Sequence, residues 1–445
     1  MKILKFGGTS VGSPSRMKAV YELIKSNETE IIVLSAVAGT TNTLVEISQA
    51  LHAKDTNKAN AVIDLLEEKY GVFVAELYKS DDYKQKGKQL VKSHFDFIRA
   101  FTIDLFTVNE EKAVLAQGEL ISTALFHYML EEDGYPSVLM PALDFMRIDE
   151  NSEPDMAYIE KNLHAEVAKH PDNKLFITQG FICRNTFGEI DNLKRGGSDY
   201  TASLVGAAIN ADEIQIWTDI DGMHNNDPRI VGKTYPIAEL SFDEAAELAY
   251  FGAKILHPSS VLPAQLKNIP VRLLNTMQPE AQGTVIKSHT VGHSIKAVAA
   301  KDGITTIKIK STRMLLAYGF LRRVFEVFER YRTSIDMITT SEVAVAVTID
   351  NDQYLEPILI ELNEFCSVEI ESNQSIICIV GDFVGEKTGY AARVFDALKD
   401  VPIHMISYGA SEHNITLLVN SGNKKAALLA LNQGIFGLVP EMDLR

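Results

Sequence analysis

Short apolar runs of strand length alternate with longer helical patterns from residue 1 to about residue 290, and this alternation limits the folds that the chain can adopt. The clearest runs cover residues 3–6, 30–35, 137–140, 175–178 and 213–218. Strands that are apolar throughout and separated by helices are typical of a mostly parallel sheet with helices on both faces. We therefore expect an α/β fold whose ligands bind at the carboxyl ends of the strands.

Composition excludes several classes of protein. The chain has 445 residues and is 46% hydrophobic, enough for two or three domains with real cores. Its formal charge of −16 disfavours a nucleic-acid partner. No apolar run approaches the roughly 20 residues that a membrane helix needs, and the N-terminus leads directly into a strand, so we expect a cytosolic protein without a signal peptide. Cys183, Cys366 and Cys378 show no paired spacing, which disfavours a disulfide framework or a structural zinc.

Two regions depart from the alternating pattern. Residues 46–116 are long, charged and helical, which predicts a helical insertion that acts as a lid or only as structural cover. After Ile286 a strand, helix, strand, strand order occurs twice, which predicts two ferredoxin-like units. The second unit is one strand short, and residues 294–300 would supply it if the first unit is inserted within the second. The predicted domains are 1–290, 303–375, and 294–302 together with 376–445.

One segment combines groups that bind anions. Arg195, Gly196, Gly197, Ser198 and Asp199 are consecutive and precede a helical pattern. Glycines allow close backbone approach, a helix N-terminus offers free N–H groups, and a guanidinium binds a carboxylate through two parallel hydrogen bonds. The alternative is an ordinary loop in which Ser198 or Asp199 caps the helix.

Two further glycine-rich segments each contain a lysine. Lys5 ends a predicted strand before Gly7 and Gly8, and Lys254 follows Gly252. A lysine beside paired glycines suits phosphate, because backbone amides surround the oxygens and the ammonium neutralises their charge. Either lysine alone would more often be a solvated surface charge.

At this point the chain resembles the aspartokinases, through motifs that occur in the family's order over essentially its whole length. The motifs are Lys5-Phe6-Gly7-Gly8-Thr9-Ser10, Gln117-Gly118-Glu119, Thr178-Gln179-Gly180-Phe181, Arg195-Gly196-Gly197-Ser198-Asp199, Trp217-Thr218-Asp219, Asp227-Pro228-Arg229 and Phe251-Gly252-Ala253-Lys254. The resemblance implies an amino-acid-kinase fold with two C-terminal ACT domains, of the monofunctional, lysine-sensitive type. It implies transfer of the γ-phosphate of ATP, accompanied by Mg²⁺, to the β-carboxylate of L-aspartate, which yields 4-phospho-L-aspartate for lysine, threonine and methionine synthesis.

The same resemblance implies roles for individual residues. Lys5 would neutralise the transferring phosphoryl group, and Asp199 would orient Lys5 or a magnesium-bound water. Arg195 would hold the α-carboxylate of aspartate, and Glu119 would accept from its α-ammonium. The implied aspartate-binding residues are Thr41, Glu119, Arg195, Gly196, Gly197 and Ser198. The implied ATP-binding residues are Lys5, Phe6, Gly7, Gly8, Thr218, Asp219, His224, Arg229 and Lys254. His224 stands where the family usually has a tyrosine, which leaves its role at adenine open, and no protein ligand of Mg²⁺ is assigned.

The C-terminal part resembles the effector pocket of lysine-inhibited aspartokinases. The implied pocket residues are Met314, Gly319, Phe320, Leu321, Ser334, Ile335, Asp336, Thr340, Ser341 and Glu342. Asp336 would meet a lysine ammonium, and amides at the helix start near Gly319 would bind its carboxylate. Leu316 and Ala317 replace polar residues of the family, so threonine or no effector stays open, and some of these residues must be strand core.

Other functions compete with this interpretation. Another amino-acid-kinase-fold enzyme would phosphorylate glutamate, carbamate or a nucleotide, and an inactive chain would only sense an amino acid. No Gly-x-Gly-x-x-Gly pattern occurs, so we expect no fused homoserine dehydrogenase. Shared sheet edges between ACT units predict a homodimer.

Overall fold

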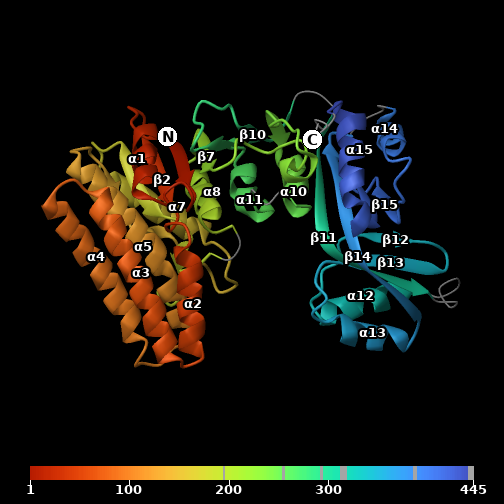
Figure 1. The fold of residues 1–445 in the computed structure, drawn as a ribbon, viewed down its shortest axis with the longest axis horizontal. Helices are drawn as coiled ribbons and strands as arrows, with labels where there is room; N and C mark the ends of the chain where they lie inside the picture. The colour runs from red at the N-terminus through yellow and green to blue at the C-terminus, as the bar shows by residue number, and fades with distance from the viewer. Residues whose placement is uncertain (194–195, 253–255, 291–293, 311–317, 384–387, 439–445) are drawn as a thin grey trace, which may run out of the picture. The chain divides into compact units, whose positions relative to one another are not determined.

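The computed structural model describes residues 1–193, 196–252, 256–290, 294–310, 318–383 and 388–438, which form two compact units (Figure 1). The first unit comprises Met1–Met223 and Leu256–His289, and the second comprises His224–Ile255 and Thr290–Arg445. Residues 224–255, predicted to belong to a continuous 1–290 domain, group with the second unit instead. Asn226 illustrates the reason, because its side chain donates to the Leu428 carbonyl in the second unit at 3.2 Å.

The first unit contributes to the predicted sheet the strands β3-β4-β2-β1-β7-β9-β10, in that order. Their bounds are β1 Lys2–Phe6, β2 Glu30–Leu34, β3 Val138–Leu139, β4 Leu175–Gln179, β7 Glu213–Thr218, β9 Val271–Asn275 and β10 Thr284–Lys287. All neighbours in this order are parallel except β9 and β10. The expected strands and the mostly parallel α/β class are confirmed.

Helices and a small hairpin complete the first unit. Their bounds are α1 Pro14–Leu23, α2 Thr40–His52, α3 Thr56–Leu77, α4 Asp81–Ala100, α5 Val108–Glu132, β5 Ile182–Arg184, β6 Ile190–Asn192, α6 Ala142–Phe145, α7 Met156–Ala168, α8 Gly197–Ala208 and α11 Pro258–Leu266. The long helices α3, α4 and α5 lie side by side and form a layer with α2 (Figure 1). Helices α2 to α5 extend from Thr40 to Glu132, beyond both limits of the predicted helical insertion 46–116, which stays a prediction.

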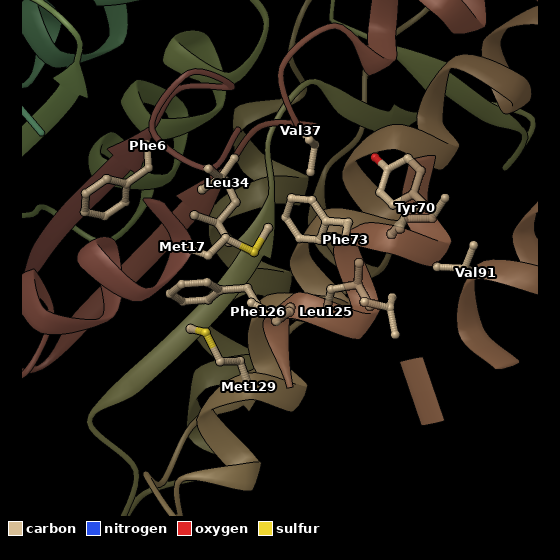
Figure 2. Packing of buried hydrophobic residues seen from close by; sticks show 14 of the residues in the cluster. Phe6, Met17, Leu34, Val37, Tyr70, Phe73, Val91, Leu125, Phe126 and Met129 are labelled. Carbon is tan, nitrogen blue, oxygen red and sulfur yellow. The ribbon is translucent and has the colours of Figure 1, made fainter. Parts of the chain in front are cut away.

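This helical layer shares its core with the sheet. Phe6 and Leu34 from the strands belong to the same buried cluster as Phe73 from α3 and Phe126 and Met129 from α5 (Figure 2). Burial of one such side chain contributes roughly 1.5–3 kcal/mol, so the layer is anchored by apolar packing. Movement of these helices as a detached lid would expose this cluster.

The second unit contains a sheet in the order β12-β13-β11-β14-β16-β15, with helices. Its elements are β8 Glu239–Ser241, α9 Pro228–Val231, α10 Phe242–Tyr250, β11 Ile295–Lys310, α12 Phe320–Arg330, β12 Ile338–Thr340, β13 Ala344–Ile349, α13 Leu355–Asn363, β14 Ser367–Gly381, α14 Tyr390–Ala397, β15 Met405–Tyr408, β16 Asn414–Asn420 and α15 Lys424–Phe436. The repeated strand and helix pattern is confirmed. The sequence also predicts a strand over residues 335–339, but β12 begins at Ile338.

Two long strands run through both halves of this second sheet. Lys310 of β11 pairs with Ser367 at one end of β14, and Ile295 pairs with Gly381 at the other. The register shifts between Lys301 and Ile304, where the two halves meet. This arrangement supports the predicted insertion of residues 303–375 within the second ferredoxin-like unit, which stays a prediction.

Two expectations from composition can be compared with the structure. Within the described ranges, none of the helices combines the length and apolar content required to cross a bilayer. The three cysteines are free thiols, and Cys183 and Cys378 are buried.

Candidate active site

Several strand ends converge at one edge of the parallel sheet. Phe6 at the end of β1 is paired with Leu34 at the end of β2 and with Trp217 near the end of β7. Leu34 is also paired with Gln179 at the end of β4. The glycine-rich segment after β1 therefore lies beside the segments that follow β2, β4 and β7. This is the edge where the sequence predicted a ligand site.

A cavity of about 320 Å³ opens at this edge. It is lined by segments that follow β1, β2 and β4, by α5 and by the start of α8, through Gly8, Ser35, Ala36, Val37, Ala38, Gly39, Thr41, Asn42, Glu119, Phe181, Gly197 and Ser198. The structure thus brings together five of the predicted residues, namely Gly8, Thr41, Glu119, Gly197 and Ser198. The volume is typical of a pocket for a small ligand.

Lys5 and Asp199 form a largely buried ion pair beside the glycine-rich segment. Lys5 Nζ lies 2.7 Å from Asp199 Oδ1, and the Lys5 residue is 9% exposed. A Cβ atom at Gly7 would lie 3.5 Å from Lys5 Nζ, so the ammonium lies directly against the backbone there. The prediction that Asp199 orients Lys5 agrees with this contact.

The start of α8 excludes the alternative in which Ser198 or Asp199 is an ordinary helix cap. The N-cap residue is Gly196, with φ of 80°, a left-handed conformation that favours glycine. Among the described residues, no side chain caps this helix end. The capping alternative is therefore wrong, and the Ser198 and Asp199 side chains are available for other contacts.

Ser198 is held in the cavity wall by close packing. Its hydroxyl accepts a hydrogen bond from Ser35 Oγ at 2.9 Å. A Cβ atom at Gly180 would lie 2.3 Å from both Ser198 Cβ and Oγ. Phe181, which follows, has φ of 68°, a strained value for a bulky residue. The turn after β4 therefore needs glycine at position 180 to accommodate Ser198.

Glu119 places a buried carboxyl group in the same cavity. It is 4% exposed, and its Oε1 accepts from the Ala36 N–H at 3.1 Å. Its Oε2 is buried and has no hydrogen-bond partner within the described part of the chain. Burial raises the pKa of Glu119 to about 8. A cationic donor placed at Oε2 would satisfy this oxygen and favour the carboxylate.

The remaining predicted aspartate-binding and ATP-binding residues have different surroundings. Arg195 and Lys254 lie outside the described residues. In the first unit, Thr218 donates to the Asp219 carboxylate at 3.1 Å at the end of β7. Arg229, in the second unit, pairs with Asp227 through two side-chain hydrogen bonds of 2.9 and 2.7 Å and is 83% exposed.

His224 also belongs to the second unit. Its Nδ1 is hydrogen-bonded to Thr234 Oγ1 at 2.7 Å. Its backbone forms an isolated bridge with Pro236. These contacts leave its role at adenine open.

A second cluster of charges surrounds Asp336 in the second unit. Asp336 Oδ1 accepts from the Tyr250 hydroxyl at 2.6 Å and from Lys301 Nζ at 2.9 Å. Lys301 also lies 2.8 Å from Asp350 Oδ2. The Asp336 side chain is fully buried, and its Oδ2 has no hydrogen-bond partner among the residues described. One ammonium thus serves two carboxylates, which leaves a net negative charge.

The remaining predicted effector residues lie on either side of α12. Met314 is outside the described residues. Gly319, with φ of 88°, is the N-cap of α12, and Phe320 is buried at its first position. Ser334 and Ile335 precede Asp336, Thr340 ends β12, and Ser341 and Glu342 lie in the turn before β13. Met337, directly before β12, is buried at 4% exposed, as predicted for part of this segment.

Sequence reasoning assigned no role to Ser35, Lys69 or Tyr70, although all three contact the cavity or its wall. Ser35 was recognised only as a strand end. Lys69 and Tyr70 lie within a long helix outside every motif, so no sequence signal separates them from structural residues.

Comparisons with known proteins agree with this geometry. A family model described as the Amino acid kinase family matches residues 1–275, and an ACT domain model matches residues 377–434. Lysine-sensitive aspartokinase 3 of Escherichia coli K12 is 33% identical over 447 residues, which cover 98% of this chain and 99% of that protein.

Solved structures show the same similarity. The E. coli aspartokinase III complex with aspartate and ADP, described as the R-state, is 33% identical with a TM-score of 0.83, covering 98% of this chain and 100% of that one. The complex of the same enzyme with lysine and aspartate, described as the T-state, is 32% identical with a TM-score of 0.81, covering 98% and 99% of the two chains.

Proposed function

This chain belongs to the aspartokinase family and is an ATP-dependent phosphotransferase that acts on the carboxyl group of aspartate, and we propose how its residues divide that work. The observation that carries the proposal is a single cavity that combines two opposite features. The glycine-rich segment and Ser198 form one part of its lining, and the unpartnered oxygen of Glu119 forms another. An amino acid with an ammonium and two carboxylates fits this combination.

The transfer itself needs positioning and charge neutralisation. An oxygen of the aspartate β-carboxylate attacks the γ-phosphorus of ATP, the bond from that phosphorus to the ADP oxygen breaks, and 4-phospho-L-aspartate and ADP result. The nucleophile is already ionised at neutral pH, so no protein base is required. Lys5 neutralises charge on the phosphoryl oxygens in the transition state, and Asp199 holds its ammonium in place.

Substrate recognition follows from the same contacts. The α-ammonium of aspartate donates to Glu119 Oε2, which satisfies the buried carboxylate. Thr41 and Ser198 add hydrogen bonds from the cavity wall. Arg195 binds the α-carboxylate, and Gly196 and Gly197 bring the backbone of the α8 start close to the substrate.

ATP is assigned to the residues that the sequence predicts to bind it. Phe6, Gly7 and Gly8 border the phosphates, and Thr218 and Asp219 contact the nucleotide. Arg229 and Lys254 neutralise phosphate charge, for which Arg229 must exchange its pairing with Asp227. His224 contacts the adenine end, through its ring or its backbone.

Mg²⁺ accompanies ATP in this proposal. Across the described residues, no group of three or more His, Cys, Asp or Glu side chains is arranged to hold a metal ion. The described side chains therefore do not form a site that would hold Mg²⁺ by protein ligands alone. Phosphate oxygens and water would therefore supply most of the ligands, because Mg²⁺ prefers oxygen ligands and usually keeps several waters. No step depends on a protein ligand of the metal.

Lysine is proposed as the feedback effector. The Asp336, Asp350 and Lys301 cluster carries a net negative charge and offers the unpartnered Asp336 Oδ2 to an ammonium. Free N–H groups at the start of α12, after Gly319, would bind the carboxylate. Two global states with different affinity for lysine would then couple this pocket to turnover.

Assembly, domain limits and location complete the proposal. The outer strands β12 and β15 of the second sheet carry the exposed side chains of Ile338, Ile406 and Tyr408, which suits a homodimer formed through the ACT domains. The predicted domains are retained, with residues 303–375 inserted within the second ACT domain. A cytoplasmic location is proposed from the absence of paired cysteines in the sequence.

One assay tests the proposed function. Purified protein with ATP, Mg²⁺ and hydroxylamine should yield a hydroxamate that depends on aspartate. Glutamate and carbamate serve as competing acceptors, and a preference for either would contradict aspartate as the substrate. Binding of an amino acid without any hydroxamate would identify a sensor instead of an enzyme. Titration of lysine and threonine into the same assay tests the effector.

A further inference from the structure

Two consecutive residues of α3 contact the segment that forms one wall of the cavity. Lys69 Nζ donates to the Ala38 carbonyl at 3.3 Å, and the Tyr70 hydroxyl is hydrogen-bonded to Thr40 Oγ1 at 2.9 Å. Ala38 itself lines the cavity, and so does Thr41, which follows Thr40 in the chain. The helical layer therefore reaches the candidate active site through two different side chains.

Tyr70 is fixed firmly enough to position its partner. It is 2% exposed, and its ring lies 6.2 Å from the Phe73 ring and 6.0 Å from the Phe95 ring, measured between centroids. Figure 2 shows Tyr70 within the apolar cluster, close to Phe73. Its hydroxyl is the polar end of an otherwise apolar anchor, so the direction of that hydrogen bond is set by packing.

Thr40 connects Tyr70 to two parts of the cavity wall. It is the first residue of α2 and is 1% exposed, and Thr41 follows it in the lining. A Cβ atom at Gly118 would lie 3.3 Å from Thr40 Cγ2, so Thr40 packs against the turn of α5 that presents Glu119. A displaced Thr40 would move the Thr41 hydroxyl and loosen the packing beside Glu119.

Lys69 adds charge to the same wall. The N-cap of α2 is Gly39, with φ of 84° and, within the described residues, no side-chain cap. A Cβ atom at Gly39 would lie 3.8 Å from Lys69 Nζ. The ammonium therefore lies beside a helix N-terminus, and both favour a carboxylate at this side of the cavity.

We propose that α3 sets the aspartate side of the active site, with Tyr70 as a positioning residue that acts through Thr40 and Lys69 as a cation that favours an acidic substrate. This inference rests on the proposed function of the cavity. It gives the helical layer a part in substrate recognition beyond structural cover.

The first experiment compares two buried tyrosines of the same region. Tyr70→Phe removes the hydroxyl bonded to Thr40, whereas Tyr78→Phe removes a buried hydroxyl that donates to the Leu125 carbonyl. Loss of one hydrogen bond at Tyr70 should raise the KM for aspartate about 3- to 10-fold and leave the KM for ATP unchanged. Tyr78→Phe should change neither KM, even if it lowers the melting temperature. Equal aspartate KM values in the two variants would overturn the positioning role.

The second experiment compares two exposed lysines of the helical layer. Lys69→Gln removes the ammonium beside Gly39, and Lys88→Gln changes an exposed residue of α4. Since Lys69 is exposed and screened, we expect a rise of about 2- to 5-fold in the KM for aspartate at low salt, shrinking at high salt. Lys88→Gln should match the wild type at both salt concentrations. An aspartate KM for Lys69→Gln that equals the wild-type value at low salt would contradict the proposed charge effect.

The wild-type enzyme separates failure of this inference from failure of the proposed function. If the wild type forms no aspartate-dependent hydroxamate, the function assigned to the cavity is wrong and the inference falls with it. If the wild type is active and both α3 variants keep its KM for aspartate, the inference alone is wrong.

Discussion

The Lys5 ammonium nitrogen lies 2.7 Å from a carboxylate oxygen of Asp199, and the two side chains are only 11% and 17% exposed. Lys5 is the penultimate residue of β1 and Asp199 lies in the first turn of α8, so residues far apart in sequence are joined where a phosphate would approach. A buried ion pair is costly to break from one side, because the remaining charge loses its partner. The pair therefore fixes the position of the ammonium before any ligand binds.

Replacement of Lys5 by alanine should lower kcat about 100- to 1,000-fold while the KM for aspartate changes by only a few-fold. The ammonium acts mainly on charge that develops during transfer, and loss of one such group typically has this size of effect. Steady-state kinetics with the hydroxamate assay measures both constants. Lys2→Ala, on the same strand but paired with the exposed Glu28, is the matched control. Near-normal turnover of Lys5→Ala would rule out the assigned role.

Glu119 should make stability depend on pH. Burial raises its pKa from the usual 4.5 to about 8, so between these values the folded chain holds a proton that the unfolded chain has released. The free energy of unfolding therefore falls as pH rises from about 4.5 to 8. Glu119→Gln should remove this contribution and be more stable than the wild type at pH 8.5, by up to a few kcal/mol at about 1.4 kcal/mol per pKa unit.

Urea unfolding of both proteins at pH 5, 6.5 and 8.5 measures the Glu119 effect. Aspartate should stabilise the wild type more strongly at pH 8.5 than at pH 6.5, because its ammonium favours the ionised carboxyl group. The Gln variant should lose that difference and bind aspartate weakly. Parallel pH profiles for the two proteins would contradict the burial argument.

Gly180→Ala should damage aspartate use. The added Cβ would lie 2.3 Å from Ser198 Cβ, so α8 or the end of β4 must shift, at a cost of about 1–3 kcal/mol in stability. We expect kcat/KM for aspartate to fall at least 10-fold because the Ser35–Ser198 contact is lost. A 10-fold fall corresponds to about 1.4 kcal/mol of transition-state stabilisation. Gly71→Ala is the control. Apart from its chain neighbours and the adjacent backbone of its own helix, no described atom lies within 4 Å of a Cβ at Gly71. A Gly180→Ala enzyme with wild-type kcat/KM would show that Ser198 is not part of the site.

Asp336→Asn should weaken inhibition by lysine. The substitution removes the carboxylate charge that the effector ammonium would meet, and a hydrogen bond to a charged group contributes about 1.5–3 kcal/mol. The lysine concentration for half-inhibition should rise about 10-fold or more, while turnover without lysine stays close to that of the wild type. Initial rates at increasing lysine measure it. Asp302→Asn, a more exposed carboxylate paired with Lys424, is the control, and an equal response of both variants would argue against a lysine pocket at Asp336.

The strands and much of the cavity could be predicted because their signals are local. A short run such as residues 30–34, rich in β-branched residues, favours a buried strand, and its end determines where Ser35 lies. Glu119 was predicted through a motif, yet the motif gives no hint that burial raises its pKa. That property depends on the surrounding packing, which brings Ala36 and the Thr40 side chain against α5.

Other features could not be predicted because they depend on contacts between distant segments. Tyr70 and Lys69 occupy ordinary positions of a long amphipathic helix, and only the packing of α3 against the start of α2 shows what they contact. The strand predicted from residue 335 begins at Ile338 in the structure, and the Asp336 side chain joins the cluster with Lys301 and Tyr250. The grouping of residues 224–255 with the second unit has the same origin, since it rests on contacts such as that of Asn226.

Because β11 and β14 run through both halves of the second sheet, residues 302–375 could be removed without breaking the rest of that sheet. Lys301 of β11 and Ile376 of β14 are direct neighbours across the antiparallel ladder, on the boundary between the halves. A tight hairpin turn between these positions would close the ladder without residues 302–375. Such an excised chain would keep β15, β16 and α15 on an intact sheet but would lose Asp336 and Asp350. The fold thus allows both carboxylates of the pocket to be removed in one segment, while Lys301 stays on a continuous sheet.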